Sequence, residues 1–247
     1  MNIELKENER IDDLEFHNLK IIQNKKGFCF GMDSVLLSDF AKQIKKGAKV
    51  IDLGTGTGIL PLLLSAKTPA SKIIGVEIQQ SVAEMATRSI TLNDLQNKIE
   101  IINEDIKNLK EQFLSNSFDV VVTNPPYKRL GTGGKNEAET KMISRHEITA
   151  NLEDFIEMTS YLLKDNASFY MVHRPERLID ISIALRKYHL EPKEMKLIYP
   201  YVDKAPNLIL IKAVKNAKPF LKILEPLYIY QKDGNYTNEV LKIYHKI

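Results

Sequence analysis

Short apolar runs and amphipathic segments alternate along the middle of the chain. Runs rich in Val, Ile and Leu predict strands over residues 49–53, 72–77, 98–102, 118–123, 167–172, 194–199 and 208–214. Apolar residues at helical spacing predict helices over 59–67, 81–93, 151–163 and 177–188. This alternation predicts an α/β fold with a Rossmann-like, doubly wound, seven-stranded and mostly parallel sheet. The last two strands have no helix between them, so an antiparallel strand is expected at one edge.

The segments before this series follow weaker patterns. Residues 16–23 predict a short strand, and residues 33–42 predict a helix with Asp33 at its N-cap. Ser81 is expected to cap the helix that it opens, with Glu84 three residues later completing a capping box.

Two further segments lie outside the regular series. Residues 220–230 predict another extended segment, and residues 128–150 are polar, contain glycine and show no period. A loop as long as the second segment is usually functional or disordered. Neither repeats nor a linker rich in Gly, Ser or Pro interrupt the sequence, so a single compact domain is expected.

Composition excludes several classes of protein. Hydrophobic residues make up 43% and charged residues 27%, which excludes a disordered or fibrous chain. The sequence has no apolar run near the roughly 20 residues that span a bilayer, and its charged N-terminus does not resemble a secretory signal. The single cysteine, Cys29, cannot form an internal disulfide and fits a reducing cytoplasm.

The net charge of +3 is distributed unevenly. Residues 1–163 contain 20 basic and 23 acidic residues, whereas residues 164–247 contain 15 basic and 9 acidic residues. A basic half can attract a polyanion such as RNA. A solvated, lysine-rich surface explains the same numbers, and charge alone favours that explanation.

A glycine-rich segment, Asp52-Leu-Gly54-Thr-Gly56-Thr-Gly58, follows the first strand of the series and opens a helix. Glycines let the chain turn tightly and let a ligand approach the backbone, and the free N–H groups at a helix start suit a polar ligand. The dinucleotide-binding pattern needs glycine at position 59, where the chain has Ile59, which disfavours a nicotinamide dehydrogenase. Alternate glycines that follow an acid resemble instead the loop of methyltransferases that use S-adenosylmethionine.

Carboxylates follow the next two predicted strands. Glu77, with Ile78 after it, ends strand 72–77, where a carboxylate can accept both hydroxyls of a ribose. In the methyltransferases that the loop resembles, the position of Asp105 commonly reaches the adenine amine while Ile106 donates a backbone N–H. Taken alone, either carboxylate suits a helix cap equally well.

The tetrapeptide Asn124-Pro125-Pro126-Tyr127 directly follows the fourth strand of the series. The prolines stiffen the turn, and their carbonyls remain acceptors. The Asn124 oxygen and the Pro125 carbonyl can together accept both hydrogens of a planar amino group, which favours rehybridisation of its delocalised lone pair. Tyr127 offers a flat ring on which a flipped base can stack, a contact worth about 1–3 kcal/mol.

The flanking segments narrow the resemblance. In these stretches the chain resembles the bacterial valine-tRNA adenine-N(6) methyltransferases: ERIDDL over 9–14, LKIIQ over 19–23, GFCFGMDSVLL over 27–37, SRHE over 144–147, HRPERL over 173–178 and YTNE over 236–239. The resemblance covers nearly the whole chain. The tetrapeptide itself is shared with enzymes that act on DNA, rRNA and protein glutamine.

This resemblance implies one methyltransferase domain over 1–247, with 1–47 as an N-terminal cover and 48–215 as the catalytic core. Numbered along the chain, its seven strands are expected in the order 3-2-1-4-5-7-6. The implied cofactor is S-adenosylmethionine and the implied substrate an adenine 6-amino group in tRNA near the anticodon, without a metal or membrane and in the cytoplasm. By the same resemblance, Asp33 closes the cofactor pocket from its other side, and Asn124 borders it.

Cationic residues near the motif are expected to contact the RNA. The predicted contacts, in addition to Tyr127, are Lys128, Arg129, Arg145, His146, Arg174 and Arg177. Guanidinium groups suit phosphates. For Arg174 and Arg177, however, surface ion pairs with Glu176 and Asp180 are an equal alternative. His146 can equally have a structural role.

Three alternative functions remain open at this stage: methylation of a guanine amine in rRNA, methylation of a release-factor glutamine, and non-catalytic RNA binding. The enzymes that act on release factors carry a sizeable helical N-terminal domain, which the segment before the glycine loop does not predict. The intact tetrapeptide and Glu77 disfavour a non-catalytic relative.

Overall fold

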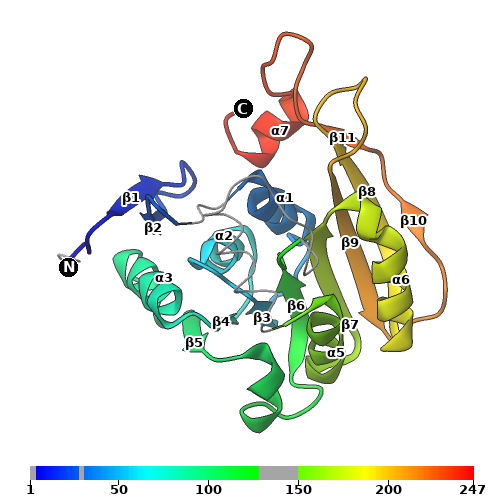
Figure 1. Cartoon of the computed structure of the whole chain (residues 1–247), viewed down its shortest axis with the longest axis horizontal. Coiled ribbons are helices and arrows are strands. Elements are labelled where there is room, and N and C mark those ends of the chain that lie inside the picture. Colours follow the sequence, from blue (N-terminus) through cyan, green and yellow to red (C-terminus); the bar gives the residue numbers. More distant parts are fainter. Residues whose placement is uncertain (1–3, 28–30, 128–149) are drawn as a thin grey trace.

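The computed structural model describes residues 4–27, 31–127 and 150–247 (Figure 1). One large sheet runs in the order β10-β8-β9-β7-β6-β3-β4-β5, and β11 also pairs with β8. Its strands are β3 (Lys49–Leu53), β4 (Lys72–Glu77), β5 (Ile99–Asn103), β6 (Phe118–Thr123), β7 (Leu163–His173), β8 (Leu190–Tyr199), β9 (Leu208–Lys215), β10 (Lys222–Ile223) and β11 (Leu227–Tyr228).

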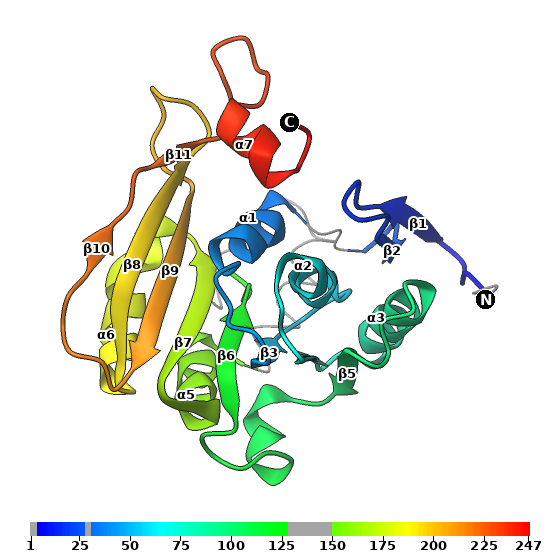
Figure 2. The same ribbon diagram turned by 180° about the vertical axis from the view of Figure 1, so that it is seen from behind.

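Helices cover both faces of the sheet, because successive side chains of each buried strand point to opposite faces. Val50 of β3 packs in the same cluster as α1, α2 and α7, whereas Ile51 packs with α5 and α6 (Figures 1 and 2). The helices are α1 (Met32–Phe40), α2 (Ile59–Lys67), α3 (Gln80–Leu92), α5 (Leu152–Leu162), α6 (Leu178–Lys187) and α7 (Asn238–Ile243), with 3-10 helices η1 (Ile106–Glu111) and η2 (Pro175–Arg177). Within the described ranges, no helix is long and apolar enough to span a bilayer.

The predicted fold class and strand order are confirmed, with one change at the edge. In structural labels the predicted order is β5-β4-β3-β6-β7-β9-β8, as observed. The antiparallel strand, β9, lies between β7 and β8 and not at the edge of the sheet. The short strands β10 and β11 extend the sheet beyond β8, and at two residues each they are too short for a hydrophobic period to reveal.

Two predicted helix caps are wrong. Ser81 does not cap α3, which begins at Gln80 without a side-chain cap, and Glu84 binds the Lys6 ammonium instead (2.6 Å). Asp33 lies in the first turn of α1, whose N-cap is Gly31. In both cases the carboxylate has a partner distant in sequence, which local patterns cannot indicate.

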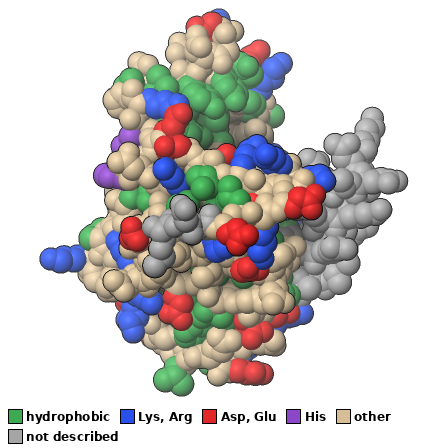
Figure 3. All heavy atoms as spheres, turned by 90° about the vertical axis from the view of Figure 1, so that its left-hand side faces the viewer, with side chains coloured by type: hydrophobic (Ala, Val, Ile, Leu, Met, Phe, Trp, Pro, Cys, Tyr) green, Lys and Arg blue, Asp and Glu red, His purple; other side chains and the backbone are tan. Residues whose placement is uncertain are grey.

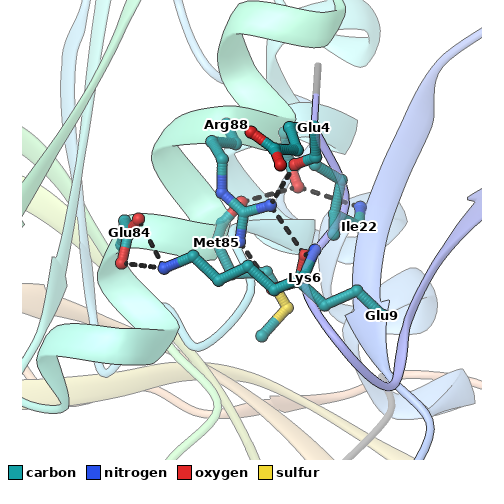
Figure 4. Close-up of polar contacts among 8 residues, drawn as sticks. Glu4, Lys6, Glu9, Ile22, Glu84, Met85 and Arg88 are labelled. Atoms are coloured by element: carbon teal, nitrogen blue, oxygen red, sulfur yellow. Dashed lines mark hydrogen bonds and ion pairs between the residues drawn. The ribbon is translucent and has the colours of Figure 1, made fainter.

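An antiparallel hairpin of β1 (Glu9–Asp13) and β2 (Lys20–Asn24) is fastened to α3 (Figure 4). The Arg88 guanidinium contacts both carboxylate oxygens of Glu9, at 2.5 and 2.7 Å, and the side chains of Glu9 and Arg88 are only 4% and 19% exposed. The Ile22 N–H donates to the Ser89 hydroxyl at 2.9 Å. On the face that carries this hairpin, acidic and basic side chains are intermixed (Figure 3). The hairpin therefore holds α3 through specific pairs.

Arg88→Ala is expected to lower the melting temperature by several degrees. Loss of a charged hydrogen bond at a mostly buried carboxylate costs about 1.5–3 kcal/mol, and each kcal/mol corresponds to roughly 2–4 °C at this chain length. Because Arg88 lowers the pKa of Glu9, this contribution is present at neutral pH and is lost as the pH falls through that lowered pKa. Thermal unfolding at neutral and acidic pH measures both effects.

Lys6→Ala is the matched control, since it removes a pair on the same hairpin whose side chains are 56% and 50% exposed. Exposed pairs contribute little, so its melting temperature should stay close to that of the parent. Equal losses in the two variants would show that burial of the Glu9–Arg88 pair is unimportant.

Candidate active site

The glycine loop folds back over the end of the neighbouring strand. Gly54, Gly56 and Gly58 all have positive φ angles (+74°, +56° and +85°), a region in which side chains are disfavoured. The N–H groups of Gly54 and Thr55 both donate to the Val76 carbonyl, at 3.0 and 2.8 Å. The loop therefore joins the carboxyl ends of β3 and β4, as the sequence predicts.

Glu77 lies under this loop and is only 1% exposed. One of its carboxylate oxygens accepts the Gly56 N–H (3.0 Å) and the other accepts the Gln79 N–H (2.9 Å). A Cβ built on Gly56 would meet no described atom within 4 Å, so the space beside the loop is open. At Gly75, by contrast, a Cβ would lie 2.8 Å from the Thr55 hydroxyl. The loop therefore also requires glycine at position 75, which lies outside the Gly54–Gly58 sequence motif.

The carboxylate of Asp52 is fully buried, and neither of its oxygens has a hydrogen-bond partner among the described residues. Burial raises its pKa to about 7, with the Thr55 hydroxyl partly opposing the rise and the nearby charge of Glu77 contributing to it. A buried carboxylate without a partner favours a cationic or N–H-bearing ligand group nearby.

The end of β5 carries the other predicted carboxylate. Asp105 caps η1, and its side chain accepts the Lys107 N–H at 2.9 Å, which is the helix-cap alternative. Ile106 is buried in the first turn of η1. Asn103 was not foreseen: its side-chain amide donates to the carbonyls of Glu77 (2.8 Å) and Ile78 (3.0 Å). Asn103 therefore fixes the backbone beside the buried Glu77, and the contacts of Asp105 and Ile106 with adenine stay predictions.

The tetrapeptide after β6 is tied to the start of α1. The Asn124 amide nitrogen donates to the Ser34 hydroxyl at 3.1 Å. The Tyr127 hydroxyl lies 2.6 Å from the Asn124 side-chain oxygen and 2.7 Å from a carboxylate oxygen of Asp33. Burial and the Asp33 charge raise the pKa of Tyr127 well above its usual value, so the phenol keeps its proton. That single proton faces two acceptors, and only one of the two contacts can be fully satisfied at a time.

The ring of Tyr127 is already in contact with two side chains of the next strand end. The Arg174 guanidinium lies 5.2 Å from the ring centroid, and the His173 ring lies 5.2 Å away at 55°. Burial, together with Arg177, lowers the pKa of His173 to about 4, and its Nδ1 accepts the Arg174 N–H (2.8 Å). Neutral His173 therefore supports Tyr127. Because Arg174 lies over one face of the ring, stacking of a base on that face requires one of the two side chains to move.

The predicted RNA contacts are only partly described. Arg174 donates to the Asn207 carbonyl at 2.9 Å, and Arg177 forms the alternative ion pair with Asp180 at 2.8 Å. The remaining cations, Lys128, Arg129, Arg145 and His146, lie outside the described residues. Within the described ranges, no cluster of three or more His, Cys, Asp and Glu side chains could hold a metal ion.

Comparison with known proteins adds to this geometry. A family model described as the methyltransferase small domain matches residues 13–176. A Porphyromonas gingivalis protein named tRNA1(Val) (adenine(37)-N6)-methyltransferase is 26% identical over 242 residues, covering 94% of this chain and 93% of its own. A Haemophilus influenzae protein of the same name is 28% identical over 231 residues, covering 92% and 94%.

Solved structures share the fold. A predicted O-methyltransferase from Agrobacterium tumefaciens superposes with a TM-score of 0.70 at 22% identity, over 87% of this chain and 96% of that chain. A tRNA m1G37 methyltransferase from M. jannaschii superposes with a TM-score of 0.60 at 16% identity, over 85% and 55%. The arrangement of helices and sheet is therefore shared well beyond the matched family segment.

Asp52→Asn is expected to stabilise the ligand-free protein while weakening its affinity for a cationic ligand. The pKa of Asp52 is raised in the folded state, so its ionisation disfavours folding increasingly as the pH rises from about 4 to 7. Relative to the parent at the same pH, the variant's melting temperature should rise by several degrees at pH 8 and by much less at pH 5. A difference of the same size at both pH values would exclude this ionisation as its cause.

Proposed function

Because the chain belongs to the methyltransferase small domain family, we propose that it transfers a methyl group from S-adenosylmethionine to the 6-amino group of an adenine in tRNA, near the anticodon. The names of the full-length relatives support the choice of substrate. The observation that carries the proposal is the position of Asn124, tied to Ser34 of α1 at the strand end next to the glycine loop. A tRNA substrate also implies that the protein acts in the cytoplasm.

The described residues fit S-adenosylmethionine at the ends of β3 and β4. Glu77 Oε2 accepts the Gly56 N–H and keeps a second lone pair, whereas Oε1 accepts the backbone and side-chain N–H groups of Gln79, and we propose that this carboxylate accepts the ribose hydroxyls when the Gln79 side chain moves aside. Gly56 leaves room for the ligand beside the backbone, and Asp52 supplies a buried negative charge without a partner. When bound, this cofactor supplies a methyl group on a sulfonium, which is activated without a metal or a strong base. The further cofactor contacts that we propose are Asp33, Gly54, Gly58, Ile78, Asp105, Ile106 and Asn124.

Asn124 positions the amine that accepts the methyl group. Its side-chain oxygen and the Pro125 carbonyl accept the two hydrogens of the amine, while Pro126 keeps the turn rigid. The contact with Tyr127 does not block this role, since the phenolic proton also has Asp33 as an acceptor. An arriving amine brings its own protons to Asn124 and leaves the phenol hydrogen-bonded to Asp33. Catalysis then consists chiefly of alignment for an in-line displacement.

Tyr127 is proposed to stack on the target base after the ring separates from Arg174. The guanidinium freed by this step lies at the mouth of the site, where it suits a phosphate. Lys128, Arg129, Arg145, His146 and Arg177 remain proposed RNA contacts on the strength of the sequence alone.

Methyl transfer from labelled cofactor to separate preparations of tRNA, rRNA and release factor tests the function. We expect label in tRNA, and N6-methyladenosine when the product nucleosides are analysed by mass spectrometry. A deletion strain should lack that nucleoside at one position near the anticodon. Label only in rRNA or in release factor would overturn the proposal in favour of the corresponding alternative.

Asn124→Ala is expected to lower single-turnover methylation by about 10²-fold or more, as loss of a preorganised polar group does elsewhere. The affinity for tRNA should change little, because phosphate contacts dominate it. Ser34→Ala is the control, since it removes only the acceptor that orients the Asn124 amide. It should give a much smaller loss of rate. Turnover of Asn124→Ala at the parental rate would refute the mechanism.

Replacements of Tyr127 separate the ring from the hydroxyl. Tyr127→Phe keeps the ring and should retain most activity at saturating tRNA and cofactor, whereas Tyr127→Ala should lose it. Single-turnover rates provide the comparison. If both variants were equally inactive, the hydroxyl would be essential and the stacking role wrong.

A further inference from the structure

A cavity of about 520 Å³ lies at the far end of α2 from the glycine loop. Gly58 precedes the first residue of α2 and Lys67 is its last, so the two sites are separated by about 13 Å of helix. Parts of α1, α2, β8 and α7 line this cavity. The charged side chains that line it, apart from two histidines, are Asp39, Lys42, Lys67, Lys196, Glu239 and Lys242.

Both carboxylates of this cavity are already paired with a lysine of the cavity. Lys42 contacts Asp39 at 3.2 Å, and Lys196, which is 20% exposed, contacts Glu239 at 2.7 Å. Lys67 differs, because no carboxylate of the described residues lies within ion-pair distance of its ammonium group. The cavity therefore carries an excess of positive charge that the protein does not balance.

Lys67 is held in place by contacts that do not neutralise its charge. Its ammonium lies 5.4 Å from the centroid of the Phe16 ring and 3.5 Å from the Ile243 carbonyl oxygen. Burial lowers its pKa to about 8, which shows that the charged form lacks sufficient stabilisation within the protein. An anion beside Lys67 would stabilise the charged ammonium.

The wall next to Lys67 is aromatic and offers hydrogen-bond donors. Phe16 contacts His17 edge-on, at 83° between the ring planes, and His245 at a tilt of 31°, with both imidazole centroids 4.4 Å from its own. Imidazole N–H groups and ammonium groups on one cavity match the acceptor oxygens of a phosphate.

We propose that this cavity binds a backbone phosphate of the RNA substrate, with Lys67 as the inner cation and Lys242 at its opening. The assignment to RNA rests on the proposed function and on the continuity between the two sites. Helix α1 runs from Asp33, beside Tyr127, to Asp39 in the cavity, a distance of about 9 Å along its axis. Tyr244, two residues after Lys242, lies close enough to Asp33 for that carboxylate to raise the pKa of Tyr244. A strand whose target base lies at Tyr127 can therefore place a nearby phosphate in the cavity.

The test compares charge removal inside and outside the cavity. Lys67→Gln should weaken tRNA binding by roughly three- to tenfold and reduce the slope of log affinity against log salt by about 0.7–0.9, as expected for one lost phosphate contact. Lys67→Arg keeps the charge, so it should retain most of the tRNA affinity and most of the salt dependence of the parent. Lys222→Gln lies on the exposed strand β10, which pairs with β8, and Lys222 is not among the residues that line the cavity; the variant makes the same change in net charge and should leave the slope unchanged. Cofactor affinity and the rate at saturating tRNA should match the parent in all three variants.

Inorganic phosphate distinguishes an RNA site from a site for a small anion. Phosphate should shift the imidazole NMR signals of His17 and His245 in the parent and not in Lys67→Gln. A phosphate response that depends on Lys67, with tRNA binding and its salt slope unchanged in Lys67→Gln, would overturn the RNA assignment. If Lys67→Gln changed neither the phosphate response nor tRNA binding and its salt slope, the proposal that this cavity binds phosphate would be wrong.

Failure of the proposed function gives a different result. The parent would then bind RNA or phosphate in a Lys67-dependent way but transfer no methyl group to tRNA. Because Lys67→Gln removes a half-buried charge that has no carboxylate of the described residues within ion-pair distance, its melting temperature should be no lower than that of the parent, which checks that the variant folds.

Discussion

The Val76 carbonyl accepts two N–H groups, those of Gly54 and Thr55, and the candidate site depends on this shared acceptor. The pair of hydrogen bonds holds the loop after β3 across the end of β4 and brings the Gly56 N–H onto Glu77. It requires a left-handed backbone at the glycines and no side chain at Gly75, because Thr55 fills that space. A single backbone acceptor near the carboxyl end of β4 thus determines how the loop meets the Glu77 carboxylate.

Much of the fold, and the placement of the glycine loop beside Glu77, could be predicted from the sequence, because both depend on local signals. The β3, β4 and β6 runs are buried on both faces and read as continuous apolar segments, and the glycines mark a turn that few other residues can adopt. Contacts between distant segments left no such signal. Ser34 and Asn124 are 90 positions apart, and neither residue type in its local sequence indicates that they meet. The hydrogen bond from Tyr127 to Asp33 was missed for the same reason.

The charge imbalance between residues 1–163 and 164–247 also depends on contacts between distant segments, which the sequence alone does not reveal. Lys164 pairs with Asp119, Lys187 with Glu153, and Lys246 with Glu15, so lysines of the basic half are matched by acids of the other half. The surplus that a linear count assigns to the C-terminal part is therefore partly neutralised by folding. Among the described residues, two charged side chains without such partners stand out against this background: Asp52, which is buried beside the glycine loop, and Lys67, which is half-buried in the second proposed site.

The position of β9 between β7 and β8 makes β9 the link between β8 and the rest of the sheet. Among the described strands, β8 pairs only with β9, β10 and β11, all of which follow it in the chain. The β8–β9 pair therefore docks on the parallel strands through the edge that β9 shares with β7. The Asn207 carbonyl, just before β9, holds the Arg174 guanidinium that lies over Tyr127. Separation of β9 from β7 would therefore leave the glycine loop and Glu77 on their own strands but remove the carbonyl that holds Arg174 over the Tyr127 ring.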